Sequence, residues 1–110
     1  MAAPTQNVII YKDGQGREPF TRWHSKLADS RAQKNILVRV NRLRAGNFGD
    51  CKPIEGGILE LRIDIGPGYR VYCARDGQNL VILLCGGDKS SQRADIETAK
   101  RYWRQYQGAK

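Results

Sequence analysis

The chain has 110 residues, of which 40% are hydrophobic and 27% are charged, a balance typical of one globular domain rather than of a disordered segment. Its 19 Lys and Arg outnumber its 11 Asp and Glu, and the resulting formal net charge of +8 at pH 7 favours an anionic partner. No apolar stretch is long enough to span a bilayer and the first residues lack the pattern of a signal peptide, which argues against a membrane protein and a secreted one.

We therefore expect a single domain over residues 1–110, ordered from about residue 7 to residue 106, in the cytoplasm. A metal site is not expected, because the chain offers one histidine, His24, and three widely spaced cysteines. The sequence carries no nucleotide-binding glycine motif or serine-hydrolase motif either, so no cofactor is expected.

The N-terminal half is predicted to contain one strand and two helices. Residues 7–11 indicate a short strand, and residues 12–16 are typical of a turn. A first helix is expected to begin near Pro19, because proline suits the first helical turn. Asp29-Ser30 is expected to form a cap between this helix and a second one, which extends from about residue 31 to residue 45. The apolar stripe of the second helix is predicted to be Ala32, Ile36, Leu37, Val40 and Leu43.

The C-terminal half is predicted to contain a three-stranded meander and a last helix. After a loop at residues 48–53, strands are expected at residues 57–65, 69–75 and 80–85, the third being the apolar central strand. Residues 86–91 are expected to form a glycine-rich turn into the last helix. That helix is expected to bury Ile96, Ala99, Trp103 and Tyr106. The order β-α-α-β-β-β-α predicts an α+β fold, with a small, mostly antiparallel sheet packed by helices.

The second predicted helix is strongly basic and carries no acidic residue. This helix and the following loop supply the residues predicted to bind RNA or the ribosome, which are Arg31, Lys34, Arg39, Arg42, Arg44 and Lys52. Such a face attracts phosphate groups, although a run of charge is often only a solvated surface. An acidic protein segment is the alternative partner for this helix.

Two arginines lie on the strands of the predicted meander. Arg62 is expected on the same face of its strand as Glu60 and Asp64, and Arg70 lies on the next strand. Arginine is costly to bury in a small sheet without a partner. One interpretation is that the arginines pair with Glu60 or Asp64 across the strands. The other is that Arg62, Arg70 and Lys89 form a concave, positively charged floor that holds a phosphodiester backbone.

The segment 86–91 also has two interpretations. Backbone N–H groups at a helix start, together with Lys89, could hold one phosphate group. Alternatively, the segment is a simple turn between strand and helix, with Ser90 or Ser91 as the helix cap. The two roles are compatible.

Three strings of the sequence resemble a known family. These are Glu60–Ile63 (ELRI), Gly66–Tyr72 (GPGYRVY) and Leu83–Gln92 (LLCGGDKSSQ), and they are similar to strings of the HigB-like addiction-module killer proteins in the RelE/ParE superfamily. The resemblance extends from about Ile9 to Tyr106. It implies the superfamily's fold and the toxin of a type II toxin–antitoxin pair, most often an mRNA endoribonuclease that acts on the ribosome and inhibits translation. It also implies a helix-turn-helix antitoxin as partner. The toxin would then contact operator DNA only through this antitoxin.

The resemblance assigns roles to individual residues. Arg70 matches an arginine that contacts the scissile phosphate, and Lys89 matches a basic residue after the last strand. Two lysines common in the superfamily are replaced by Ile58 and Glu60, and the usual C-terminal tyrosine is missing, with Asp95 nearest its position. The catalytic residues expected on this basis are Arg70, Arg62, Lys89, Asp88, Asp95 and Tyr72.

In the expected reaction the cations stabilise the phosphate, Asp88 or Asp95 accepts the 2′-hydroxyl proton, and Tyr72 orients or donates. No metal takes part in it. Two alternatives remain, the first of them favoured by the missing lysines. One is a ParE-like inhibitor of DNA gyrase, and the other is a module that binds RNA or the antitoxin without catalysis.

Overall fold

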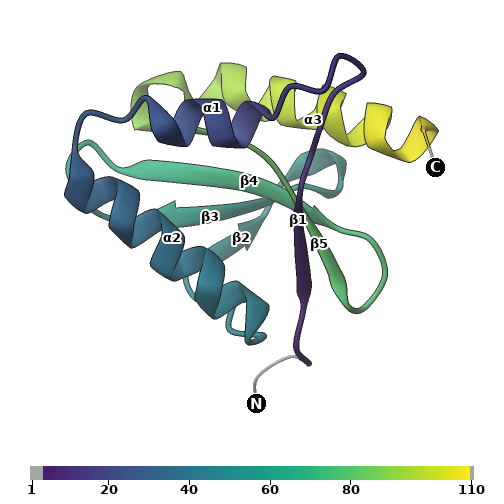
Figure 1. Ribbon diagram of the computed structural model, residues 1–110, viewed down its shortest axis with the longest axis horizontal. Helices are drawn as coiled ribbons and strands as arrows, with labels where there is room; N and C mark the ends of the chain where they lie inside the picture. Colours follow the sequence, from purple (N-terminus) through teal and green to yellow (C-terminus); the bar gives the residue numbers. More distant parts are fainter. Residues whose placement is uncertain (1–3, 110) are drawn as a thin grey trace.

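The computed structural model describes residues 4–109, in which a five-stranded sheet lies between helices (Figure 1). The strands are β1 (Asn7–Ile10), β2 (Cys51–Pro53), β3 (Leu59–Ile63), β4 (Tyr69–Arg75) and β5 (Leu80–Asp88). The helices are α1 (Pro19–Ser25), α2 (Ser30–Arg44) and α3 (Gln92–Gly108), with short 3₁₀ turns at Glu55–Gly57 and Lys89–Ser91.

The sheet has the strand order β1-β5-β4-β3-β2. β1 runs parallel to β5, and all the other pairs are antiparallel. The predicted α+β class and the mostly antiparallel sheet are therefore confirmed. β5 lies between β1 and β4 and is buried over most of its length, which explains why its sequence is apolar without alternation.

Two segments differ from the prediction. Within the expected loop 48–53, residues Cys51–Pro53 form the edge strand β2 opposite β3. Three residues are too few to show a strand period in the sequence. The expected glycine turn is wrong at its start, because Gly86, Gly87 and Asp88 continue β5 and pair with β4.

The two glycines of β5 are needed because a helix contacts the strand at each of them. A Cβ atom on Gly86 would lie 2.3 Å from the Trp23 ring of α1. A Cβ atom on Gly87 would lie 1.8 Å from the Asp95 carboxylate of α3. Neither glycine has a positive φ, so the sequence Gly86-Gly87 serves close packing on both sheet faces rather than a turn.

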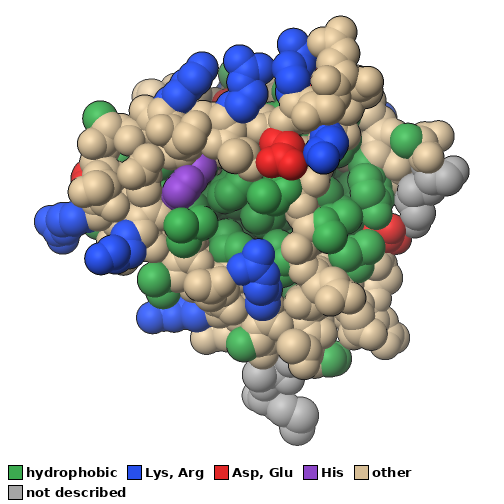
Figure 2. Space-filling view, in the orientation of Figure 1, with side chains coloured by type: hydrophobic (Ala, Val, Ile, Leu, Met, Phe, Trp, Pro, Cys, Tyr) green, Lys and Arg blue, Asp and Glu red, His purple; other side chains and the backbone are tan. Residues whose placement is uncertain are grey.

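The sheet has a hydrophobic core on each face. α1 and α2 cover one face, where side chains such as Ile36, Leu61 and Leu83 are buried. α3 covers part of the other face, where Tyr72 and Leu84 are buried. Figure 2 shows the first face, with hydrophobic side chains visible in the middle, between the places that α1 and α2 occupy in Figure 1.

The predicted helix stripes are largely confirmed. α2 buries Ala32, Ile36, Val40 and Leu43, but Leu37 is 46% exposed and its place in the stripe was wrong. Leu37 follows Ile36 directly and therefore lies about 100° further round the helix. On α3, Ala99 is fully buried, and Ile96, Trp103 and Tyr106 are half-buried against the same core. No helix within residues 4–109 has the length and apolar character needed to cross a membrane.

We predict that Gly86→Ala destabilises the fold by about 1–3 kcal/mol, because the new methyl group overlaps the packed Trp23 ring. Urea unfolding measures this change as a lower midpoint. Gly14→Ala is the matched control, because a Cβ atom at Gly14 would have no neighbour within 4 Å. Equal midpoints for the two variants would contradict the packing role of Gly86.

Candidate functional site

A hollow of about 300 Å³ lies where the ends of β3 and β4 meet the turn after β5. We call it the cationic hollow, and its lining is Asp50, Arg62, Asp64, Gly66, Pro67, Gly68, Arg70 and Lys89. Three of these side chains are cations, and each comes from a different segment: Arg62 from β3, Arg70 from β4 and Lys89 from the turn after β5. The structure therefore brings together the three cations that the sequence analysis selected.

The two arginines are direct neighbours across the sheet. Arg62 is paired with Arg70 in the antiparallel register of β3 and β4, so both side chains lie on the α3 face. Like charges in this position repel each other and destabilise a strand pair. The arrangement requires a counter-charge on the same face.

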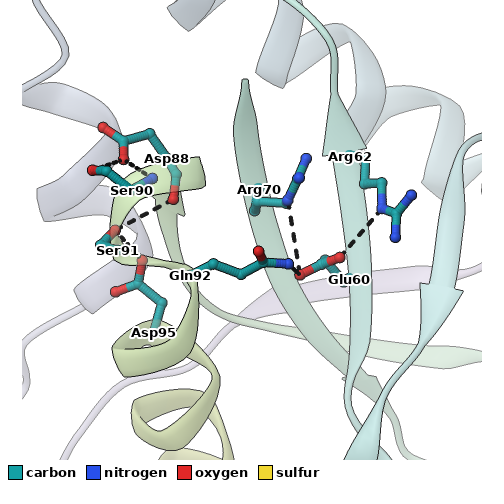
Figure 3. Close-up of polar contacts among 8 residues, drawn as sticks. All are labelled: Glu60, Arg62, Arg70, Asp88, Ser90, Ser91, Gln92 and Asp95. Carbon is teal, nitrogen blue, oxygen red and sulfur yellow. Dashed lines mark hydrogen bonds and ion pairs between the residues drawn. The ribbon is translucent and has the colours of Figure 1, made fainter. Parts of the chain in front are cut away.

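Glu60 supplies that counter-charge (Figure 3). It lies two residues before Arg62 on β3 and is only 1% exposed. Its Oε1 atom is 3.3 Å from Nε of Arg62, and its Oε2 atom is 3.9 Å from Nε of Arg70. Because the second distance is too long for a hydrogen bond, Arg70 is held by charge, whereas Arg62 is also hydrogen-bonded.

Gln92, the first residue of α3, fixes the Glu60 carboxylate from the other side. Its Nε2 atom donates a hydrogen bond of 2.8 Å to Oε2 of Glu60. Burial raises the pKa of Glu60, but the hydrogen bonds from Gln92 and Arg62, the adjacent Tyr72 hydroxyl and the charge of Arg70 outweigh it and lower that pKa. Glu60 is therefore an ionised carboxylate at neutral pH, and its negative charge is buried.

Both ion pairs with Glu60 use the Nε edge of the guanidinium group. The side chains keep different access to solvent: that of Arg62 is 35% exposed and that of Arg70 is 12% exposed. Both arginines line the hollow together with the exposed Lys89, and Glu60 neutralises part of their combined charge. This arrangement suits an anion that contacts several cations at once, such as a phosphate group.

The structure places the other expected catalytic residues outside the lining of this hollow. Oδ1 of Asp88 accepts hydrogen bonds from the backbone N–H of Ser90 at 2.8 Å and from its hydroxyl at 2.5 Å, so Asp88 caps the turn. Asp95 accepts a 2.5 Å bond from the Ser91 hydroxyl, and burial raises the pKa of Asp95. Tyr72 is fully buried beside Glu60, and burial and then the charge of Glu60 raise its pKa.

Two carboxylates that do line the hollow were not among the expected catalytic residues. Asp64 directly follows β3 and continues the every-second-residue pattern of Glu60 and Arg62. The two-residue period of the strand could therefore have predicted that Asp64 lies near them. Asp50 precedes β2 and is brought close by a main-chain bond, since Arg62 N donates to Asp50 O at 2.9 Å. Nothing in the local sequence predicts that contact.

The basic residues of α2 divide into two groups. Four of them are exposed, as is Lys52 on β2; they are Arg31, Lys34, Arg42 and Arg44. Arg39 differs, because its guanidinium donates hydrogen bonds to the main-chain carbonyls of Phe48 and Asp50, both at 3.1 Å, and of Arg62. Arg39 therefore ties α2 to the segment before β2 and to β3, a structural role that the sequence analysis did not predict.

Comparison with known proteins identifies relatives of this chain. Residues 25–104 match the family described as "Phage derived protein Gp49-like (DUF891)", a family of toxin-like proteins in toxin–antitoxin contexts. The chain is also 57% identical over 81 residues to a protein of Haemophilus influenzae (strain Rd) described as uncharacterized, an alignment that covers 74% of this chain and 82% of that protein. The family match includes all three cations of the hollow.

We predict that Arg39→Ala lowers the free energy of unfolding by about 1.5–3 kcal/mol, because three carbonyl groups lose a charged donor. Arg42→Ala is the control, since Arg42 is an exposed arginine on the same helix, and it should change stability by less than about 0.5 kcal/mol. Chemical denaturation of both variants measures the difference. A stable Arg39→Ala protein would show that Arg39 does not hold the segment in place.

We predict that Glu60→Gln lowers stability by about 3 kcal/mol at pH 7, because two opposed arginines lose their counter-charge. A carboxylate with a lowered pKa stabilises the fold above its unfolded pKa, and this contribution is lost as the pH falls through the folded pKa. The gap between wild type and variant should therefore shrink below pH 4.5, the ordinary pKa of glutamate. Unfolding curves between pH 7 and acid pH test this, and a gap independent of pH would contradict it.

Proposed function

Because the chain belongs to the Gp49-like family of toxin-like proteins, we propose that it is the toxin of a toxin–antitoxin pair and that it cuts RNA as a metal-independent endoribonuclease. Its resemblance to HigB-like members of the RelE/ParE superfamily supports the proposal, as does its α+β fold. The observation that carries it is the cationic hollow, a space of about 300 Å³ whose lining includes Arg62, Arg70 and Lys89.

RNA carries its own nucleophile beside each phosphate, so the protein's contribution is position and charge. In the proposed reaction the 2′-oxygen bonds to phosphorus, and the bond between phosphorus and the 5′-oxygen breaks. The products are a 2′,3′-cyclic phosphate and a 5′-hydroxyl group. Arg62, Arg70 and Lys89 stabilise the negative charge that grows on the phosphate oxygens.

The 2′-hydroxyl proton needs an acceptor, and the hollow offers two. Asp50 and Asp64 line it, whereas the carboxylates of Asp88 and Asp95 are hydrogen-bonded to serines outside it. We assign the acceptor role to Asp50 or Asp64 for this reason. The 5′-oxygen takes its proton from Lys89 or from water.

The proposed partners follow from the toxin role. The substrate is messenger RNA on the ribosome in the cytoplasm, so that cleavage inhibits translation. A helix-turn-helix antitoxin neutralises the protein, and operator DNA is contacted only through this antitoxin. The exposed cations of α2, which are Arg31, Lys34, Arg42 and Arg44, suit either ribosomal RNA or an acidic antitoxin segment.

We predict that Arg70→Ala lowers the rate of RNA cleavage by about 10²–10³ and abolishes growth inhibition, because a transition-state cation is lost. Lys89→Ala should cause a smaller but clear loss. Cleavage of a 5′-labelled RNA measures both rates, and circular dichroism checks that the variants are folded. Arg104→Ala is the control, an exposed arginine of α3 outside the cationic hollow. An Arg70→Ala protein as active as wild type would exclude the assigned site.

The cellular target is tested separately by inducing the protein without its antitoxin. We expect primer extension to find new 5′ ends within messenger RNA, and chromosomal DNA to remain intact. DNA breaks with intact messenger RNA would instead indicate a gyrase inhibitor. Normal growth of the induced cells would indicate a binding module without catalysis.

A further inference from the structure

A second surface, distinct from the cationic hollow, has the features of a nucleic-acid site. A hollow of about 810 Å³ lies between the segment after β1 and the C-terminal half of α3. A hollow of about 390 Å³ adjoins it beside α1, and the two share Asp13, Arg17 and Tyr102. We call the two together the α1–α3 groove, and none of its lining residues lines the cationic hollow.

The groove is strongly positive. Its cations are all exposed and lie on α1 and just after it, on α3, and on the segment between β1 and α1; they are Lys12, Arg17, Arg22, Lys26 and Arg101. Figure 2 shows Lys and Arg side chains along the top of the molecule, over the region of α1 and α3 in Figure 1.

One carboxylate lines the groove, that of Asp13, and the protein uses it internally. Asp13 accepts hydrogen bonds from the backbone N–H groups of Gln15 and Arg17 and from Nε of Arg17, at 2.9, 2.9 and 3.0 Å. The backbone bond from Arg17 is the main reason that the pKa of Asp13 is lowered. These bonds hold the segment in one shape and leave the groove with an excess of positive charge.

Aromatic rings lie among these cations. Tyr102 is half-buried, with one ring contact to the buried Tyr11 at 5.0 Å between centroids. The Arg101 guanidinium lies 5.4 Å from the centroid of the Tyr102 ring. Trp23 lines the α1 side of the groove and is also half-buried. Partly exposed rings between spaced cations are the elements that bind the bases and backbone of a single strand.

We propose that the α1–α3 groove binds a single-stranded segment of RNA. The choice of RNA rests on the proposed function of the cationic hollow. A chain fits better than a single phosphorylated molecule, because the cations are spread along the groove and do not converge on one point. An acidic protein segment would use the cations but would have less use for the rings.

The test measures the Kd of a fluorescent 12-nucleotide 2′-O-methyl RNA by anisotropy. This RNA lacks the 2′-hydroxyl nucleophile, so binding is measured without cleavage. The variants are Arg101→Glu, the pair Arg22→Glu with Lys26→Glu, and Tyr102→Leu. Arg104→Glu is the matched control, since Arg104 is exposed on α3 but lines neither hollow of the groove. Circular dichroism and thermal unfolding confirm that each protein is folded.

We expect each charge variant to raise Kd about tenfold and to reduce the salt dependence of log K by about 0.7 for each lost phosphate contact. Tyr102→Leu should raise Kd about fivefold without changing the salt dependence, because it removes an aromatic ring and no charge. Arg104→Glu should have a clearly smaller effect than Arg101→Glu.

Equal Kd values for Arg101→Glu, Arg104→Glu and wild type would overturn the inference. Weaker antitoxin binding with unchanged RNA binding would also overturn it, and would make the groove a site for an acidic protein. The proposed function can fail independently. If the wild-type protein cuts no RNA but the groove variants lose RNA binding, the groove is supported as an RNA-binding site and the nuclease activity is excluded. Normal RNA binding by groove variants, with cleavage lost in Arg70→Ala, would overturn the groove and support the nuclease.

Discussion

The buried carboxylate of Glu60 is the interaction on which the candidate site depends. The register of β3 and β4 places Arg62 directly opposite Arg70, an arrangement that is unfavourable without a counter-charge. Glu60 contacts both arginines and is fixed by Gln92 at the start of α3. The first turn of this helix thus takes part in the electrostatics of the site, and sheet and helix must both be in place before the two cations can share one hollow.

The glycine pair of β5 positions α3 for this role. Gly87 is opposite Arg70 in the sheet, and the absence of a side chain there lets Asp95 of α3 lie against the strand. Gly86 allows the same close approach to Trp23 on the opposite face. The glycine pair is therefore a packing feature, which lets α1 and α3 lie close to β5.

Periodicity and turn chemistry predicted the order of the long elements, the apolar strand β5 and most of the buried faces. The strand β5 lies inside the sheet, but its centre is β4. These signals missed β2, which is too short to show a period. They also misplaced Leu37, which lies about 100° round α2 from Ile36, and the two glycines, whose role depends on their contacts with α1 and α3. In the site, Arg62 and Arg70 could be selected because arginine is costly to bury in a small sheet, and the family resemblance pointed to Arg70 and Lys89. The contacts of Arg39 and the approach of Asp50 come from tertiary hydrogen bonds, which no local pattern contains.

The central claim is that one phosphate of an RNA strand sits against this carboxylate-supported pair of arginines. A crystal structure with a short RNA that carries a 2′-O-methyl group at the scissile nucleotide tests it most directly. We expect side-chain nitrogens of Arg62, Arg70 and Lys89 to lie within hydrogen-bond distance of a single phosphate, while Glu60 keeps its contacts with both arginines and with Gln92. An RNA strand bound elsewhere, with no phosphate in the cationic hollow, would contradict it.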